Sequence, residues 1–519
     1  MRRPFRPLTV AIAVTAVAAV ALPGSAVQAA PPARPPTITW TPCAEDPTAE
    51  CGTLRVPVDW SRPRGQTFEL ALARRKATDP AARIGSLVIN PGGPGGSGVD
   101  FALFAHEYFT PDIARRFDIV GFDPRGVARS HPVVCSLDLL LQAPSPLLTS
   151  QADFDAMLAF NRRLRQDCRR HTGPLYDHVD TSSVVRDLDA LRAALGDDKL
   201  SYYGVSYGTL IGQQYAEVFP HRVRALTLDS NMDHSLGTRD FMDTETLSVQ
   251  DAFEEFAAWC DRTVGCALHG RDVSALWRDL LARADRGEVH DPGEPTIVLT
   301  AFDIINFATG AFYGPAWFEL AELIAALDAG SALSATVRAR LSPPRAQSPE
   351  LVENPFEAVF CQDWSLPVRD YAEFARHLRR IGRLAPDMRY SPLALIVTSC
   401  LGTPTPINNP QHRLDVRGSR TLLLTNSLHD PATGYNWAAN AARQLGRSAV
   451  LLTYEGWGHG VYAREACSTG VVDRYLIGLR LPPRGARCPG VEPTPPAIQL
   501  RQSVLPRTDR WRLLSLPHM

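Results

Sequence analysis

The feature that most constrains the fold of this chain is a glycine-flanked serine between an expected strand and an expected helix. Residues 200–205 are rich in aromatic and β-branched side chains, as buried strands are, and a helical pattern begins at Thr209. Between them lies Gly204-Val-Ser-Tyr-Gly208. The two glycines leave room where side chains would collide with the neighbouring strand and helix, and the turn itself is strained. This arrangement predicts a nucleophile elbow that exposes the hydroxyl of Ser206.

Expected strands and helices alternate on both sides of this serine. The strand patterns lie at 52–58, 67–74, 86–90, 117–122, 222–229, 420–425 and 448–453, and helical patterns at 181–195, 209–218, 436–445 and 469–479. Such alternation predicts a mostly parallel sheet with helices on both faces. Together with the elbow motif it indicates the α/β-hydrolase fold. In these sheets the chemistry gathers at the carboxyl ends of the strands, where Ser206 lies.

Between residues 235 and 395 the pattern becomes helical. The expected helices there are 246–258, 273–283, 301–312, 317–327 and 370–381. We therefore expect a large helical cap (235–395) inserted into one α/β core, whose two parts are residues 37–234 and 396–488. The proline-rich residues 489–519 are expected to form an arm or a disordered tail.

The first 29 residues have the features of a secretory signal peptide. Three arginines precede an apolar run at 8–22, and small residues lead to a cleavage site near Ala29. The run has about 15 residues, whereas a membrane span needs about 20. We expect a secreted protein without a stable membrane span after cleavage.

Export changes the interpretation of the cysteines. The chain has ten of them: Cys43, Cys51, Cys135, Cys168, Cys260, Cys266, Cys361, Cys400, Cys467 and Cys488. An even set in an oxidising compartment predicts disulfides, here five. Spacing favours pairing of neighbours in order, with the first pair and the third closing short loops, but sequence leaves the connectivity open. No pair has CxxC spacing and none lies beside a ligand-like histidine, so no metal site is expected.

A serine nucleophile needs a base to remove its proton and an acid to orient that base. In this fold the expected chain order is Ser, then Asp or Glu, then His. Asp430 follows one late strand and His459 follows the next. Both therefore lie on loops at the same edge of the sheet as Ser206, and we expect these three residues to form the catalytic triad.

Four other polar residues compete for roles near this site. His429 is an alternative base, and Asp229, which ends the strand after the elbow, is an alternative acid. The simpler role for each is in a turn or a helix cap. Asp123 and Arg125 are expected to be a buried structural pair that shapes a loop rather than catalytic groups.

A glycine-rich loop supplies the expected oxyanion hole. Asn90-Pro-Gly-Gly-Pro-Gly-Gly-Ser-Gly98 follows a strand, and its glycines let the backbone approach a substrate closely. We expect the N–H groups of Tyr207 and Gly93 to bind the oxyanion, with Gly92 as the alternative to Gly93. No Lys-Ser or Lys-Thr follows the glycines, which argues against a phosphate-binding loop.

Taken together, these motifs resemble those of the secreted tripeptidyl aminopeptidase group of α/β-hydrolases, which is related to prolyl aminopeptidases. The resemblance runs from about Trp40 to Cys488 and rests on Asn90-Pro-Gly-Gly-Pro-Gly-Gly-Ser-Gly98, Asp123-Pro-Arg-Gly126 with Ser130, Gly204-Val-Ser-Tyr-Gly-Thr209, Cys361-Gln-Asp363, Asp430-Pro431 with Thr433, and Gly458-His-Gly460. Two positions depart from the family pattern: Gly434, where a proline often follows the threonine, and Ala128, where a glycine often continues the Asp-Pro-Arg-Gly motif.

The resemblance implies cleavage of short peptides from free N-termini through an acyl-enzyme, without metal or cofactor. In that scheme Ser206 is the nucleophile, His459 the general base and then acid, and Asp430 the orienting carboxylate. A carboxylesterase or lipase that uses the same triad is the alternative, since fold does not settle substrate. A non-enzymatic binding protein on the same scaffold is a third hypothesis.

An exopeptidase must bind the ammonium of its substrate, and the expected cap is acidic. Residues 233–294 contain fourteen Asp or Glu against six Arg, an excess that attracts an amine. Glu254, Glu255 and Asp363 are the candidate amine ligands, with a solvated helix face or a surface ion pair as the simpler role of each.

The net charge of -1 excludes the basic surface typical of nucleic-acid binders. Sequence leaves the oligomeric state open.

Overall fold

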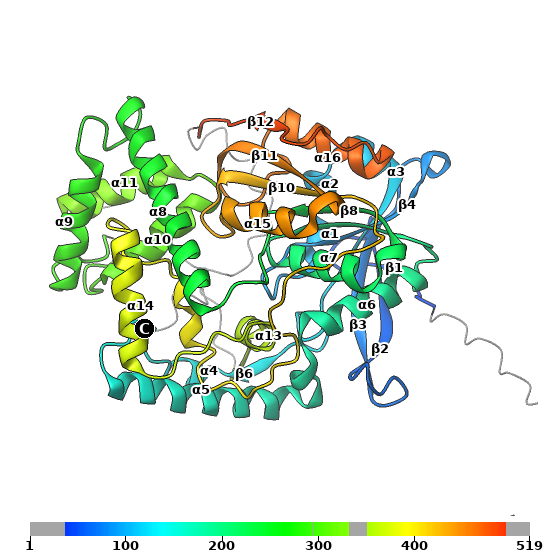
Figure 1. The fold of residues 1–519 in the computed structure, drawn as a ribbon, viewed down its shortest axis with the longest axis horizontal. Helices are drawn as coiled ribbons and strands as arrows, with labels where there is room; N and C mark the ends of the chain where they lie inside the picture. Colours follow the sequence, from blue (N-terminus) through cyan, green and yellow to red (C-terminus); the bar gives the residue numbers. More distant parts are fainter. Residues whose placement is uncertain (1–36, 293, 332–349, 495–519) are drawn as a thin grey trace, which may run out of the picture. The chain divides into compact units, whose positions relative to one another are not determined.

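The computed structural model describes residues 37–292, 294–331 and 350–494 (Figure 1). The expected signal peptide (1–29) and residues 495–519 of the expected tail lie outside the described residues. None of the helices within the described ranges has the length and apolar character that crossing a membrane requires.

A ten-stranded sheet organises the described chain, in the order β1-β2-β3-β5-β4-β7-β8-β10-β11-β12. Pairing is antiparallel from β1 to β5 and parallel from β5 through β12, which confirms the expected mostly parallel sheet. The strands are β1 (Thr41–Pro42), β2 (Glu50–Pro57), β3 (Thr67–Arg75), β4 (Gly85–Asn90), β5 (Phe117–Phe122), β7 (Leu200–Val205), β8 (Val223–Asp229), β10 (Leu422–His429), β11 (Ala449–Trp457) and β12 (Arg487–Pro489). A separate small sheet pairs β6 (Val134–Ser136) with β9 (Leu351–Glu353).

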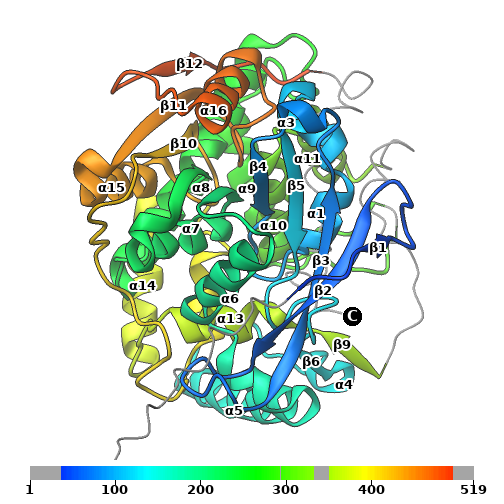
Figure 2. The same cartoon turned by 90° about the vertical axis from the view of Figure 1, so that its right-hand side faces the viewer.

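Helices cover both faces of the large sheet (Figure 2). Successive strand residues point to opposite faces: on β4, Leu87 and Ile89 enter one hydrophobic cluster and Val88 enters the other. The first cluster contains residues of α1 (Gly98–Leu103), α2 (Ala105–Tyr108), α3 (Pro111–Arg116) and α16 (Ala466–Gly478), and the second contains residues of α6 (Thr181–Ala194), α7 (Tyr207–Val218) and α15 (Tyr435–Leu445).

A third and largest hydrophobic cluster lies within the helical part of the chain. Its residues come mainly from α8 (Thr238–Arg262), α9 (Val273–Asp285), α10 (Ala301–Tyr313), α11 (Trp317–Ala329), α13 (Pro355–Asp363), α14 (Tyr371–Leu384), the 3-10 helix η4 (Ala394–Thr398), α4 (Leu137–Leu140) and α5 (Gln151–Thr172). The 22-residue α5 precedes the expected cap boundary at 235 and shares this cluster with the cap helices.

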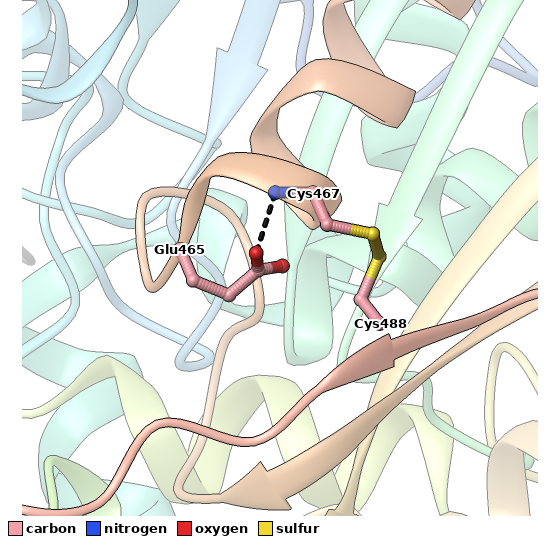
Figure 3. Close-up of side chains that lie close together, drawn as sticks. All are labelled: Glu465, Cys467 and Cys488. Atoms are coloured by element: carbon pink, nitrogen blue, oxygen red, sulfur yellow. Dashed lines mark hydrogen bonds between the residues drawn. A yellow bond between two sulfur atoms is a disulfide. The ribbon is translucent and has the colours of Figure 1, made fainter.

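Five disulfides join the ten cysteines in sequence order, as spacing favoured: Cys43–Cys51, Cys135–Cys168, Cys260–Cys266, Cys361–Cys400 and Cys467–Cys488. The last joins α16 to β12 (Figure 3). Within the described residues, one group brings three metal-ligating side chains together, namely these two cysteines and Glu465. Its sulfurs are bonded to each other, and the Glu465 carboxylate accepts from the Cys467 N–H at the start of α16.

Candidate active site

Ser206 lies at the sharp turn between β7 and α7. Its backbone has φ 58° and ψ -125°, a strained left-handed conformation that is rare for residues with a side chain. A Cβ on Gly204 would lie 2.6 Å from the Gly208 carbonyl oxygen, and one on Gly208 would lie 2.7 Å from Oδ1 of Asn90. Only glycine fits at either position, so the elbow has the tight geometry that the sequence predicted.

His459 and Asp430 meet at the ends of neighbouring strands β10 and β11. Nδ1 of His459 lies 3.0 and 3.1 Å from the two carboxylate oxygens of Asp430, and Asp430 also accepts from the N–H groups of Ala432 and Thr433. Burial opposes ionisation of Asp430, but the charge of His459 and these hydrogen bonds outweigh it and hold the pKa of the carboxyl below its usual value. The carboxylate therefore fixes Nδ1 as the donor and leaves Nε2 as the acceptor.

The other ring nitrogen, Nε2 of His459, is buried and has no hydrogen-bond partner among the described residues. The hydrogen bond from Ser206 to this atom is thus not formed in the structure, and such bonds often tighten only when substrate binds. Tyr313, the last residue of α10, contacts His459 in two ways. Its carbonyl oxygen accepts from the backbone N–H of His459 at 2.8 Å, and the centroids of the two rings are 5.1 Å apart.

The glycine loop lies directly against the elbow. A Cβ on Gly92 would lie 3.0 Å from the Ser206 Cβ and 2.9 Å from the Tyr207 nitrogen. The Gly92 N–H already donates to Oδ1 of Asn90 at 2.9 Å, whereas the described residues provide no acceptor for the Gly93 N–H. Tyr207 begins α7, so its N–H has no acceptor within the helix. This geometry favours Gly93 over Gly92 as the second donor beside Tyr207.

The competing base and acid have other partners. Nδ1 of His429 lies 2.9 Å from the Asp251 carboxylate on α8. Asp229 accepts from the N–H groups of Val461 and Tyr462, so it anchors the loop that follows His459 to the end of β8. Neither residue contacts Nε2 or Nδ1 of His459.

Asp123 and Arg125 are both fully buried, but the expectation that they pair with each other is wrong. Arg125 forms two hydrogen bonds of 2.7 Å to Asp187 on α6. Asp123 instead accepts from the Ser97 hydroxyl and the Val99 N–H, so it holds the end of the glycine loop. Their structural roles differ because Asp123 binds the end of the glycine loop, while the longer side chain of Arg125 reaches α6.

Asp363 does not have the free carboxylate that amine binding requires. It is fully buried and accepts from the Thr181 N–H and hydroxyl, the Asn409 amide and the Tyr207 hydroxyl. Burial, and next the charge of Asp180, raise its pKa to about 7 against these hydrogen bonds. These four donors occupy both carboxylate oxygens, so Asp363 supports Tyr207 rather than facing a substrate.

The other two amine candidates lie on α8. Glu254 accepts from the Gln250 amide at 2.9 Å, and Glu255 accepts from the Trp457 indole N–H at 2.7 Å. Glu255 is therefore beside the strand that leads to His459, whereas Glu254 is exposed.

The sequence analysis missed Tyr313, because a tyrosine at the end of a helix carries no signal of contact with a histidine 146 residues later.

Comparisons with known proteins identify the family to which the chain belongs. Residues 85–299 match the α/β-hydrolase fold family, and residues 390–488 match a family described as TAP-like protein. The chain is 34% identical to serine protease Hip1 of Mycobacterium tuberculosis over 92% of this chain and 96% of that protein. It is 32% identical to a tripeptidyl aminopeptidase of Streptomyces lividans, over 91% of this chain and 90% of the relative. A protein named carboxylesterase B of M. tuberculosis is 33% identical, over 90% of this chain and 92% of its own length.

Proposed function

Because the chain belongs to the α/β-hydrolases that carry a TAP-like C-terminal region, we propose that it is an exported serine exopeptidase that releases short peptides, chiefly tripeptides, from free N-termini. The observation that carries the proposal is the hydrogen bonding of the two ring nitrogens of His459. One ring nitrogen is bound to the buried Asp430, and the other is buried and has no hydrogen-bond partner in the part of the chain that the structure describes. It lies at the edge of the sheet where Ser206 follows β7.

The reaction follows from these positions. The Ser206 hydroxyl gives its proton to Nε2 of His459 while its oxygen bonds to the carbonyl carbon of the scissile amide. The N–H groups of Tyr207 and Gly93 stabilise the oxyanion. The C–N bond then breaks, and His459 gives the proton to the leaving amine. Water attacks the acyl-enzyme with His459 again as base, and the proton returns to the oxygen of Ser206.

Cleavage from a free N-terminus is supported by the relative named tripeptidyl aminopeptidase and by the acidic composition of residues 233–294. Export is supported by the five disulfides, which persist in oxidising compartments, and by the signal-like residues 1–29. The relative named carboxylesterase B favours a second candidate function, ester hydrolysis by the same triad.

A matched set of chromogenic amides separates the two candidates. We expect the protein to hydrolyse a tripeptide amide with a free N-terminus faster than the one- or two-residue amides, and far faster than its N-acetylated form. Ser206→Ala should abolish all of these activities. Equal or faster turnover of acetylated amides and simple esters would overturn the aminopeptidase proposal in favour of the esterase.

A further inference from the structure

The residue that ends β8, Asp229, is hydrogen-bonded to two segments of the proposed triad. Its backbone carbonyl accepts from the Ser206 N–H at 2.8 Å. Its carboxylate accepts from the N–H groups of Val461 and Tyr462, each at 2.9 Å. One residue therefore binds the backbone of the nucleophile through its main chain, and the loop that follows the catalytic histidine through its side chain.

Ser230 extends this contact by one residue. Its hydroxyl accepts from the Gly460 N–H at 2.8 Å, and its own N–H donates to the Thr425 carbonyl on β10 at 2.9 Å. Ser230 has φ 61°, in the left-handed region that residues with a side chain rarely adopt and that often marks a functional turn. Three successive N–H groups directly after His459, those of residues 460–462, thus donate to two neighbouring side chains.

The order of the strands puts this turn at the centre of the triad. β8 lies between β7, which ends at the elbow, and β10, which leads to Asp430. Asp229 is paired with Val205 on β7 and also with β10. Among the described residues there is no hydrogen bond between Ser206 and Nε2 of His459. Other contacts must therefore set the position of the imidazole relative to the elbow.

Burial makes the contacts of the Asp229 carboxylate costly to lose. Asp229 and Ser230 are both fully buried. The carboxylate also accepts from the Tyr203 hydroxyl at 2.7 Å, and that hydroxyl lies 2.7 Å from the hydroxyl of Tyr108. Hydrogen bonds to a charged group are roughly twice as strong as those between neutral groups, and buried donors without an acceptor are costly. The carboxylate is therefore a firm anchor for the loop.

We propose that Asp229 and Ser230 are positioning residues, which set the distance between the Ser206 hydroxyl and Nε2 of His459 by holding residues 460–462 against the turn that binds the elbow. This assignment rests on the triad of the proposed function and deepens it, and it holds for a peptide and for an ester substrate alike. A displacement of about 1 Å can lower a rate by about 100-fold. Loss of these hydrogen bonds should therefore slow proton transfer from the serine to the histidine.

The test uses a small reagent that labels serine hydrolases whichever substrate they cleave. The phosphorus of diisopropyl fluorophosphate bonds to the Ser206 oxygen and fluoride leaves, while Nε2 of His459 takes the proton of the hydroxyl. The second-order rate constant of labelling reports the serine and the histidine together. The fraction of protein that is finally labelled, measured by mass spectrometry, reports how much of it is correctly folded.

The variants are Asp229→Asn and Ser230→Gly, with Asp473→Asn as the control. Asparagine keeps the size of the side chain but has one acceptor oxygen in place of two, and glycine tolerates the positive φ while lacking the hydroxyl. Asp473 accepts from the hydroxyls of Tyr462 and Thr110, so its variant removes a carboxylate that contacts the same loop through a side chain.

We expect Asp229→Asn to lower the rate constant of labelling by about 10–100-fold and Ser230→Gly by about tenfold, with complete labelling in both. Asp473→Asn should stay within about twofold of the wild type. In steady-state hydrolysis of p-nitrophenyl acetate, the loss in the first two variants should lie in kcat, with KM within about twofold, because neither side chain contacts the substrate.

The outcomes separate the inference from the triad on which it rests. A wild-type protein that is not labelled, or a Ser206→Ala variant that is labelled equally, would overturn the triad. Labelling of the wild type through Ser206, together with an unchanged rate constant in Asp229→Asn, would overturn only the positioning role. A smaller labelled fraction that reacts at the wild-type rate would also overturn it, because Asp229 would then support folding alone. So would an equal loss in Asp473→Asn.

Discussion

At the scale of single residues, the site is specified by which buried polar atoms have partners and which do not. Asp430 receives several hydrogen bonds, and of the two ring nitrogens of His459 only Nδ1 has a hydrogen-bond partner among the described residues. His429, one residue from Asp430, is bound to Asp251 on α8. His459 can therefore accept a proton at its second ring nitrogen, whereas His429 is held in an ion pair with Asp251.

This distinction is testable with two aspartate variants. In Asp430→Asn, the amide N–H₂ donates to Nδ1 of His459 and moves the ring proton to Nε2, so the histidine no longer accepts from Ser206. We expect kcat to fall by about 10⁴-fold, the size of the effect of the equivalent change in trypsin-like triads. Asp251→Asn should leave kcat within about twofold. The opposite ranking in steady-state assays would identify His429 as the base.

The glycine loop makes a second prediction at this scale. A Cβ at Gly92 would lie 2.3 Å from the Val205 carbonyl and 2.9 Å from the Tyr207 nitrogen, and Gly92 has φ 84°. Gly92→Ala should therefore displace the loop from the elbow and lower kcat by at least about 100-fold, as loss of one oxyanion donor does. Gly237→Ala, whose Cβ meets nothing within 4 Å, is the control and should retain activity. Normal activity in Gly92→Ala would place the oxyanion elsewhere.

At the scale of secondary-structure elements, Asp363 joins three helices. It ends α13 and accepts from Thr181 at the start of α6 and from Tyr207 at the start of α7. These bonds fix α13 over the residue that supplies the proposed oxyanion donor. Because the carboxyl is buried at this junction, its protonation state affects the packing of all three helices.

The raised pKa of Asp363, about 7 in the folded protein against 3.8 ordinarily, gives a prediction for stability. The folded state retains a proton that the unfolded chain has released between about pH 4 and 7. The contribution of Asp363 to the free energy of unfolding is therefore full below about pH 4 and is lost as the pH rises through 7, with a slope of at most about 1.4 kcal/mol per pH unit. Asp363→Asn, which stays neutral, should lack this slope.

Urea unfolding at several pH values measures the difference between wild type and variant, so that other titrating groups cancel. The control is Asp240→Asn, which changes an exposed aspartate of α8 and should leave the pH dependence unaltered. A pH dependence in Asp363→Asn identical to that of the wild type would mean that Asp363 is ionised in the folded protein throughout this range.

Sequence patterns located most elements of the core because short-range chemistry determines them. Short runs of apolar residues define the buried strands, and the steric need for glycine around Ser206 defines the elbow. The sequence analysis missed α5, although Phe154, Met157, Leu164 and Cys168 have helical spacing. The hydrogen bonds from residues 460–462 to the turn after β8 depend on the order of the strands in the sheet, and no local pattern encodes that order.

At the scale of the whole molecule, the large sheet and the helical part of the described chain belong to one compact unit. Residues of the helical part contact each portion of the candidate site: the Tyr313 carbonyl accepts from the backbone N–H of His459, Asp363 accepts from the Tyr207 hydroxyl, and Pro355 lies against the glycine loop. The site is therefore complete only when the inserted helices are correctly folded onto the sheet, and activity is expected to report on the folding of the cap as well as of the core.

The disulfides that stabilise this arrangement should not contribute equally. Cys361–Cys400 closes a loop with a sequence separation of 39 and joins α13 to the loop that follows η4, whereas Cys260–Cys266 has a separation of 6. In the chain-entropy description, a crosslink stabilises the folded state more when it closes a longer loop, which gives about 4 kcal/mol for the first pair and about 2 kcal/mol for the second. Replacing both cysteines of each pair by alanine and measuring the free energy of unfolding in urea tests this order.

Because α13 contacts both oxyanion segments, loss of the Cys361–Cys400 pair should also reduce activity in the folded protein, and loss of the Cys260–Cys266 pair should not. If the shorter loop proved the more important for both stability and activity, the cap would be anchored to the site through α8 rather than through α13.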